Sequence, residues 1–314
     1  MKILLLKPIN DVYHVIQPSL GLGYIATILL NKGHDVQLVD SGRDKLTWKG
    51  FTEKITKEQY DLVGIQMFTR EILSVKRHCE IIKKYSPHTK ICLGGPHISG
   101  DPEGTMQLLP SIDFGFIGEA EIGIEKYVCN GDNPETVPNL VWRKGERVVV
   151  NRKEYIKNLD SIKFPAWQLM KPAGYPIAPH GSFCKRTPIA PLIISRGCPF
   201  LCTYCAGRLM TGKKIRYRSV KNVIEEIKLL YNSYGVREIH IEDDNFTLKK
   251  EYVIEFCKEI SRLNLDIAFA LPNGIRLDTL DKDVVTALEI AGFYSIGVGI
   301  ESGSDRVLRL MKKH

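Results

Sequence analysis

The chain has 314 residues, of which 44% are hydrophobic, and a formal net charge of +8. This length allows two domains, and the apolar content is enough for buried cores. The positive charge is spread along the chain, which argues against a nucleic-acid-binding protein. The longest apolar stretch, Leu20–Leu30, is too short to span a bilayer and no signal peptide is present, so we expect a cytoplasmic protein without membrane contact.

Residues 1–139 alternate short apolar runs with helical patterns. The expected strands are Lys2–Leu6, Val36–Asp40, Leu62–Met67, Ile91–Leu93 and Phe114–Ile117, and the expected helices are Leu20–Asn31, Ile72–Tyr85 and one beginning at Glu119. Strands that alternate with helices predict an α/β domain with a doubly wound, Rossmann-like parallel sheet. Such sheets bind ligands beyond the carboxyl ends of their strands.

Glycine-rich turns follow several of these strands, at Pro18–Gly23, Gly94–His97 and Gly118–Glu119. Neither a G-x-G-x-x-G after the first strand nor a G-x-x-x-x-G-K-[ST] occurs, so the turns do not predict a phosphate site.

Residues 140–191 form a hairpin and a linker. The hairpin is expected at Leu140–Val150, with its turn at Lys144-Gly145. Six prolines from Pro165 to Pro191 exclude long regular structure in the linker.

Residues 192–314 show a second run of four βα units. The expected strands are Leu192–Ser195, Glu238–Glu242, Asp266–Leu271 and Tyr294–Ile300, and the expected helices are Val220–Tyr234, Tyr252–Leu263, Val284–Ala291 and one beginning near Asp305.

Three of the eight cysteines, Cys198, Cys202 and Cys205, lie on one loop of this second run. In a reducing compartment, clustered cysteines indicate metal binding or catalysis before disulfides. A structural zinc site or a ferredoxin cluster needs four ligands, and the nearest further thiol, Cys184, lies upstream in the linker. Three thiolates suit a 4Fe-4S cluster with one open iron, and zinc is the alternative. We expect Cys79, Cys92, Cys129 and Cys257 to be packing residues.

The segment Arg196–Cys205 resembles the radical S-adenosylmethionine enzymes, whose signature has three cysteines at these gaps and an aromatic residue before the last. The resemblance implies that Cys198, Cys202 and Cys205 bind the cluster and that Tyr204 packs near the adenine of S-adenosylmethionine. It also implies reductive cleavage of S-adenosylmethionine to a 5′-deoxyadenosyl radical, with an electron donor such as flavodoxin or ferredoxin.

Three further segments resemble strand-end segments of the same family: Glu242–Thr247, Gly274–Asp278 and Gly299–Gly303. They imply S-adenosylmethionine contacts from Asp243, Arg276 and Glu301, and ordinary capping or surface pairing is the alternative for each. The family's partial (β/α) barrel has six units, so we expect a barrel that is incomplete at the C-terminus.

Residues 1–139 resemble the cobalamin-binding domain that precedes the radical domain in one subgroup. The resemblance implies cobalamin contacts from Ser19, Gly21, Gly94, Gly95, His97, Gly118 and Glu119. His14 lacks the flanking residues of an Asp-x-His-x-x-Gly motif, so we expect cobalt without a protein ligand from below. A domain that has lost its ligand is the alternative.

The combined resemblance implies a cobalamin-dependent radical enzyme that methylates an unactivated carbon of a small-molecule substrate. A radical rearrangement, cyclisation or oxidation without methyl transfer is one alternative. A non-enzymatic iron–sulfur or zinc-binding protein is the other.

Overall fold

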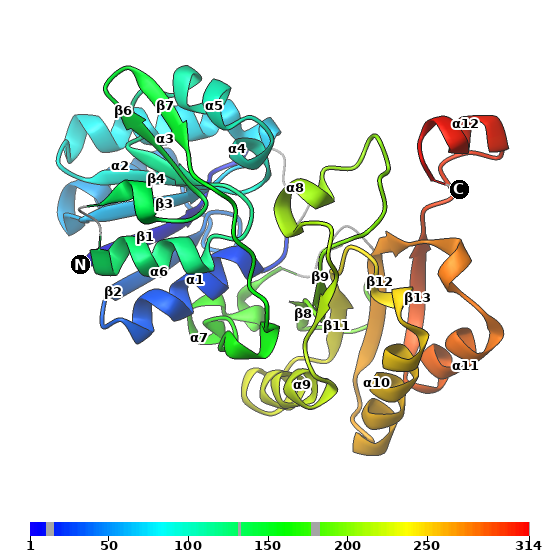
Figure 1. Ribbon diagram of the computed structural model, residues 1–314. Coiled ribbons are helices and arrows are strands. Elements are labelled where there is room, and N and C mark those ends of the chain that lie inside the picture. The colour runs from blue at the N-terminus through cyan, green and yellow to red at the C-terminus, as the bar shows by residue number, and fades with distance from the viewer. Residues whose placement is uncertain (11–15, 131–132, 177–182, 314) are drawn as a thin grey trace. The chain divides into compact units, whose positions relative to one another are not determined.

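The computed structural model describes residues 1–10, 16–130, 133–176 and 183–313 (Figure 1). The chain divides into two compact units. The first contains residues 1–13, 19–156 and 163–170, and the second contains residues 14–18, 157–162 and 171–314. Within the described ranges, no helix is both long enough and apolar enough to cross a membrane.

The first unit is built on a seven-stranded sheet with the order β2-β1-β3-β4-β5-β6-β7. The strands are β1 (Lys2–Lys7), β2 (Asp35–Asp40), β3 (Leu62–Gln66), β4 (Lys90–Gly94), β5 (Phe114–Phe116), β6 (Leu140–Lys144) and β7 (Arg147–Val150). β1 to β5 are parallel, which confirms the predicted doubly wound sheet, and the predicted hairpin adds β6 and β7 antiparallel to β5. Strand order reverses between β1 and β3, so the loops after these strands open at one point of the carboxyl edge.

Helices cover the sheet of the first unit in pairs, α1 with α6 and α2 with α3 (Figure 1). The helices are α1 (Leu20–Asn31), α2 (Trp48–Glu58), α3 (Ile72–Tyr85), α4 (Pro96–Gly100), α5 (Pro102–Leu108), α6 (Glu121–Asn130) and α7 (Trp167–Met170). The sequence analysis missed α2, because only Phe51 and Ile55 of its residues are buried and the segment is polar on average. Its start is nevertheless encoded, since the Thr47 hydroxyl accepts the Gly50 N–H at 3.1 Å.

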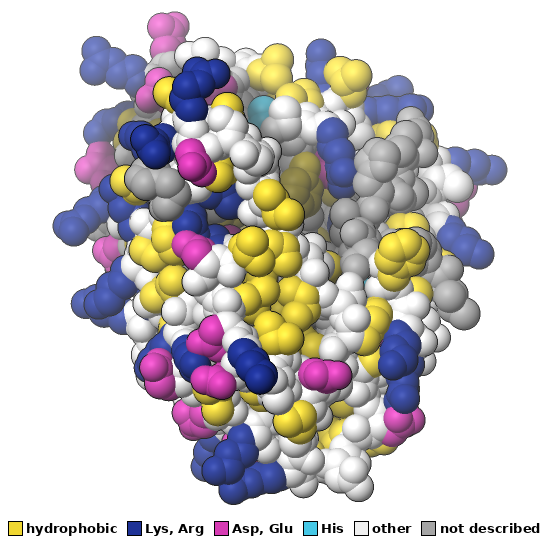
Figure 2. All heavy atoms as spheres, turned by 90° about the vertical axis from the view of Figure 1, so that its right-hand side faces the viewer, with side chains coloured by type: hydrophobic (Ala, Val, Ile, Leu, Met, Phe, Trp, Pro, Cys, Tyr) yellow, Lys and Arg dark blue, Asp and Glu magenta, His cyan; other side chains and the backbone are white. Residues whose placement is uncertain are grey.

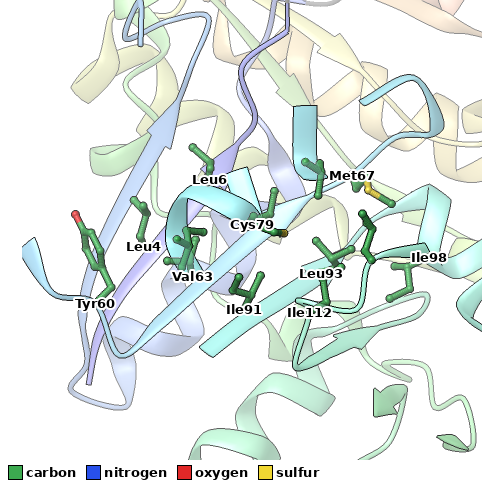
Figure 3. Close-up of a cluster of buried hydrophobic side chains, with 14 of the residues drawn as sticks. Leu4, Leu6, Tyr60, Val63, Met67, Cys79, Ile91, Leu93, Ile98 and Ile112 are labelled. Atoms are coloured by element: carbon green, nitrogen blue, oxygen red, sulfur yellow. The ribbon is translucent and has the colours of Figure 1, made fainter. Parts of the chain in front are cut away.

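The core of the first unit lies between the central strands and the helices α2 and α3 (Figure 3). Leu4 and Leu6 of β1, Val63 of β3, and Ile91 and Leu93 of β4 are fully buried in it. Such continuous apolar runs are expected where helices cover both faces of a parallel sheet.

A buried histidine occupies the contact between α2 and α3. The His78 ring lies 4.6 Å from the ring centroids of both Trp48 and Phe51, and its Nδ1–H donates to the Ser74 carbonyl oxygen at 2.8 Å. Burial lowers the pKa of His78 to about 4, with the neighbouring Arg77 adding to the effect. The imidazole is therefore neutral in the folded protein near neutral pH.

The second unit contains a four-stranded parallel sheet in the order β13-β12-β11-β8. Its strands are β8 (Ile189–Leu192), β11 (Glu238–Ile241), β12 (Ala268–Ile275) and β13 (Phe293–Val298), and its main helices are α9 (Val220–Tyr234), α10 (Lys250–Leu263), α11 (Lys282–Ile290) and α12 (Asp305–Leu310). The four predicted βα units are confirmed. Figure 2 turns toward the viewer the side where β13, α11 and α12 lie in Figure 1, and hydrophobic side chains gather near its centre.

The strand predicted at Leu192–Ser195 was placed too late, because β8 is Ile189–Leu192. Pro191 lies inside it, where the sequence suggested linker. The order of the sheet puts β8 at one end, and an end strand tolerates a residue that cannot donate a ladder hydrogen bond. Ser195–Arg196 instead forms β9, which pairs with β10 (Arg216–Tyr217).

We predict that His78 makes the first unit sensitive to acid. Unfolding restores an ordinary histidine pKa, so the unfolded chain binds one more proton between about pH 6.5 and pH 4. The folded-state pKa is lowered, so the free energy of unfolding should fall with falling pH in this window, by about 1.4 kcal/mol per pH unit from this residue.

His78→Phe keeps an aromatic ring against Trp48 and Phe51 and should flatten this component of the pH profile. Urea unfolding followed by tryptophan fluorescence reports on the first unit, which contains His78. All three tryptophans, Trp48, Trp142 and Trp167, lie in this unit. Parallel pH profiles of the wild type and the variant would contradict the assignment.

Candidate functional site

The three clustered cysteines lie on the irregular loop between β9 and the short helix α8 (Gly207–Thr211). Gly197 opens the loop with a φ of +101°, and a Cβ at this position would collide with the Lys214 carbonyl. Only glycine is therefore compatible with this close approach of two backbones. The Cys198 N–H then donates to the Gly212 carbonyl oxygen at 3.1 Å, which closes the loop.

The thiols of the loop differ in exposure. Cys198 and Cys202 are partly buried and Cys205 is exposed. Burial raises the pKa of Cys198, and Asp244 and the other two thiols add to the rise. Among the described residues, no three His, Cys, Asp or Glu side chains are already arranged to hold a metal ion. As a donor set, the loop offers three soft thiolates, which suit iron–sulfur clusters or zinc.

Cys184, the possible fourth ligand, lies at the other edge of the sheet. The adjacent Lys185 N–H donates to Glu238 Oε2 at 2.8 Å, and Glu238 is the first residue of β11. The Tyr294 hydroxyl, near the start of β13, donates to the carbonyl of Phe183 at 2.7 Å. The cysteine loop follows the carboxyl end of β8, so the length of the strands separates it from Cys184.

Asp243 is the second residue after β11 and is 3% exposed. Its carboxylate accepts hydrogen bonds from the Ile194 N–H at 2.7 Å and from the Ser195 N–H and hydroxyl at 2.8 and 2.6 Å. Burial raises the pKa of Asp243 to about 7 against the effect of these donors. The carboxyl group of Asp243 therefore holds the segment that leads into the loop.

Arg276, which follows β12, is brought to the cysteine loop. Its guanidinium lies 3.9 Å from the centre of the Phe200 ring, and Phe200 is between the first two cysteines. Nε and Nη2 donate to Asp278 at 2.9 and 2.6 Å. The hydrogen bond to Asp278 raises the pKa of Arg276, so the guanidinium stays charged.

Tyr204 and Glu301, both predicted from the sequence, are brought together by Lys313. The Lys313 ammonium donates to Glu301 Oε1 at 2.9 Å and lies 5.9 Å from the centre of the Tyr204 ring. The pKa of Glu301 is lowered, first by the hydrogen bond from Lys313 and then by one from Tyr204. The Thr203 N–H also bonds the Met311 carbonyl at 3.0 Å, so the loop contacts the segment after α12.

Sequence reasoning did not assign Phe200 and Lys313 to this site. Phe200 could have been found as an aromatic residue inside the cysteine motif, whereas nothing near Lys313 in the sequence points to Tyr204. Asn245 is 1% exposed, and both polar atoms of its side chain have no hydrogen-bond partner in the described part of the chain.

In the first unit, the predicted residues gather at the carboxyl edge of the sheet. Ser19 begins α1, and its hydroxyl donates to Gln66 Oε1 at the end of β3, which is the point where strand order reverses. A Cβ on Gly21 or Gly94 would meet no atom within 4 Å, so both backbones can be approached closely. Gly95 has a φ of +107°, and a Cβ there would lie 2.9 Å from the Met67 carbonyl oxygen.

Three other predicted residues of this edge make protein contacts. His97 Nδ1 lies 3.0 Å from the Thr69 hydroxyl, and the Gly118 N–H donates to the Ser99 hydroxyl at 2.9 Å. Glu119 is buried and its Oε2 accepts the Ile156 N–H at 2.9 Å, so this carboxylate anchors the chain that follows the hairpin. His14 lies outside the described residues.

Two family models match the chain. The B12 binding domain matches residues 6–128, and the radical SAM superfamily matches residues 192–314. An uncharacterized methyltransferase of Pyrococcus horikoshii is 32% identical over 100% of this chain and 68% of its own length. The cytidylyl-2-hydroxyethylphosphonate methyltransferase of Streptomyces wedmorensis is 28% identical, and the match covers 99% of this chain and 67% of that protein. An anaerobic magnesium-protoporphyrin IX monomethyl ester cyclase of Synechocystis is 27% identical, and the match covers 94% of this chain and 59% of that protein.

Two solved structures share the fold. The radical S-adenosylmethionine methyltransferase TsrM of Kitasatospora setae has a TM-score of 0.78 at 17% identity, and the match covers 98% of this chain and 60% of TsrM. The cobalamin-dependent radical enzyme OxsB has a TM-score of 0.80 at 18% identity over 100% of this chain and 46% of OxsB. The chain thus spans about half of the length of these two proteins.

The class follows from the two matched domains and from the Pyrococcus horikoshii relative, whose match covers all of this chain. The chain belongs to the radical S-adenosylmethionine enzymes that carry a cobalamin-binding domain.

We predict a graded reactivity of the eight cysteines in the reduced, metal-free chain. The exposed Cys205 and Cys129 should alkylate fastest, and Cys198 should be slower because burial raises its pKa and lowers its thiolate fraction. Cys79, Cys92 and Cys257 are buried and should be protected, with burial raising the pKa of Cys79 and Cys257 to about 12. The exposure of Cys129 shows that its prediction as a packing residue was wrong.

Iodoacetamide labelling resolved by peptide mass spectrometry measures all eight rates at once. The guanidinium-unfolded chain is the control, since its thiols should react at similar rates. Rapid labelling of Cys257 in the folded chain, or protection of Cys205, would be incompatible with the described loop.

Proposed function

We propose that Cys198, Cys202 and Cys205 bind a 4Fe-4S cluster and that S-adenosylmethionine binds at its open iron. The observation that supports this most strongly is the placement of three thiols on one loop, at the carboxyl ends of a parallel sheet, with Cys184 at the opposite edge. A closed zinc site would need a fourth ligand at the loop. The described residues around the loop supply Arg276 and the Glu301–Lys313 pair instead.

Around S-adenosylmethionine we assign Tyr204 to the adenine and the charged residues Arg276 and Glu301 to the polar groups of the ligand. Charged side chains at strand ends suit an ammonium, a carboxylate and ribose hydroxyls. Asp243 contributes indirectly, because it fixes residues 194 and 195 at the base of the loop.

Cobalamin is proposed to bind at the carboxyl edge of the first unit. The open backbones at Gly21 and Gly94 and the tight turn at Gly95 support this, because a flat ring can approach where no side chain intervenes. Ser19, His97, Gly118 and Glu119 frame the same edge, with Glu119 acting as an anchor. Residues 1–139 would thus form the cobalamin domain, 140–191 the connecting hairpin and linker, and 192–314 the radical domain.

The bound cofactors would supply reductive cleavage of S-adenosylmethionine to a 5′-deoxyadenosyl radical and a methyl group for an unactivated carbon. The chain itself supplies the thiolate ligands, the orientation of S-adenosylmethionine and a place for a small-molecule substrate. The electron would come from a cytoplasmic donor such as flavodoxin or ferredoxin.

Cyclisation without methyl transfer is a second candidate, because a cyclase is among the relatives and matches 94% of this chain. The two functions differ in what becomes of the methyl group of S-adenosylmethionine. Formation of S-adenosylhomocysteine together with 5′-deoxyadenosine would favour methylation. Formation of 5′-deoxyadenosine alone would favour cyclisation.

We predict that each of the three loop cysteines is needed for the cluster. After anaerobic reconstitution with iron and sulfide, Cys198→Ser, Cys202→Ser and Cys205→Ser should lose the iron of the cluster, because an open-iron cluster has no spare protein ligand. With dithionite and S-adenosylmethionine, these variants should form no 5′-deoxyadenosine above background.

Cys184→Ser and Cys129→Ser are the matched controls and should keep both iron and cleavage. Iron retention in Cys202→Ser, or its loss in Cys184→Ser, would overturn the open-iron assignment. One bound zinc and no iron would favour a zinc-binding protein instead.

We predict that cobalamin binds the first unit without a histidine below the cobalt. Electron paramagnetic resonance of the cob(II)alamin-loaded chain should show no nitrogen splitting from a protein imidazole. Gly94→Val should bind cobalamin roughly tenfold more weakly, which corresponds to about 1.4 kcal/mol, because a side chain enters the open space.

Gly303→Val is the control, since a Cβ there also meets nothing within 4 Å but the residue belongs to the second unit. Nitrogen splitting that disappears in His97→Ala or His14→Ala would show that a histidine is the ligand after all. Equal cobalamin affinity of the two glycine variants would remove Gly94 from the site.

A further inference from the structure

Arg276 is held in a single orientation next to the cysteine loop. The Phe200 ring covers its guanidinium at 3.9 Å, and Asp278 accepts from Nε at 2.9 Å and from Nη2 at 2.6 Å. The side chain is 11% exposed. A planar guanidinium that is stacked on one face and bonded along one edge has little freedom left.

The third nitrogen of this guanidinium is unused. Nη1 is buried and has no hydrogen-bond partner within the described ranges. The thiols of Cys202 and Cys198 act electrostatically on the same guanidinium. A buried donor without a partner is costly, so a group that accepts from Nη1 would be favoured at this place.

We propose that Arg276 tunes the reduction potential of the cluster, by placing a fixed positive charge and the free Nη1–H beside it. This inference rests on the proposed cluster at Cys198, Cys202 and Cys205. A one-electron reduction by the external donor makes the cluster more negative by one charge, and a nearby cation stabilises that charge. Hydrogen bonds to the sulfurs act in the same direction.

The contacts leave Arg276 one donor for the polar groups of S-adenosylmethionine, and the tuning role adds to this recognition. Asp278 already occupies the Nε–Nη2 edge, so Arg276 cannot also offer that edge to a second carboxylate. Only Nη1 remains as a donor. The contact with Phe200 holds the guanidinium next to the loop that carries the three cysteines.

The experiment is a redox titration of the anaerobically reconstituted full chain without S-adenosylmethionine, followed by the electron paramagnetic resonance signal of the reduced cluster. Arg276→Gln should lower the equilibrium constant for reduction roughly tenfold, about 59 mV for one electron, because it removes the charge. Arg276→Lys keeps the charge and should recover part of the loss.

Asp278→Asn should shift the equilibrium the other way, because it removes the negative charge that offsets Arg276. Its effect should be smaller, since Asp278 is 57% exposed and screened by water. Arg262→Gln is the control for the loss of one arginine. It is 61% exposed in the last turn of α10, and that turn lies toward the amino ends of the strands.

Equal potentials for Arg276→Gln and Arg262→Gln would overturn the inference. If Arg276→Gln binds S-adenosylmethionine more weakly at an unchanged potential, Arg276 only recognises the ligand and the tuning role is wrong. If Arg276→Gln fails to assemble a cluster, Asp278→Asn decides, and a potential that stays or falls in this variant overturns the inference. Iron analysis comes first. If the wild type holds no iron, the proposed function itself is wrong, and the tuning role falls with it.

Discussion

The second unit depends on one buried carboxylate. Asp243 at the end of β11 accepts three hydrogen bonds from Ile194 and Ser195, and these two residues lead directly into the cysteine loop. A buried carboxylate is stable only when donors replace the lost water, and here the donors belong to the neighbouring chain segment. Satisfying this buried carboxyl group with hydrogen bonds therefore fixes the start of the loop relative to the sheet, and Gly197 then turns the backbone so that the thiols follow at the carboxyl edge.

In both units the parallel strands bring the segments that follow them to one edge of the sheet, but the residues gathered there differ in kind. Parallel strands bring their carboxyl ends to one edge, whichever residues follow them. In the first unit β4 ends in glycine, at Gly94 and Gly95, and the open backbone at this strand end suits contact with a broad, flat ligand. In the second unit the strands end in thiols and charged side chains such as Arg276, which suit a metal cluster and a zwitterionic ligand. The fold gathers the residues, and the residue types decide what each edge can bind.

Most of the architecture could be predicted from the sequence, because buried parallel strands are continuous apolar runs and the helices between them are periodic. The errors have local causes: β8 contains Pro191, and α2 buries only two residues. Side-chain direction could not be predicted. Asp243 and Glu119 are strand-end carboxylates like any ligand-binding residue, yet both accept backbone N–H groups inside their own unit. Only the three-dimensional arrangement shows which strand-end carboxylates are already occupied.

Glu301, one of the residues proposed to contact S-adenosylmethionine, has an unfavourable backbone angle. Its φ of +62° lies in the left-handed region, which costs a residue with a Cβ on the order of 1 kcal/mol. Such a conformation persists only when surrounding contacts outweigh its cost, and the described contacts of the carboxylate are with Lys313 and Tyr204. An exposed ion pair is a weak contact, so by itself it explains the angle poorly. A ligand that donates a hydrogen bond to the Glu301 carboxylate, next to Tyr204, would add a contact in this orientation of Glu301. Such a contact would help to offset the cost of the left-handed backbone angle.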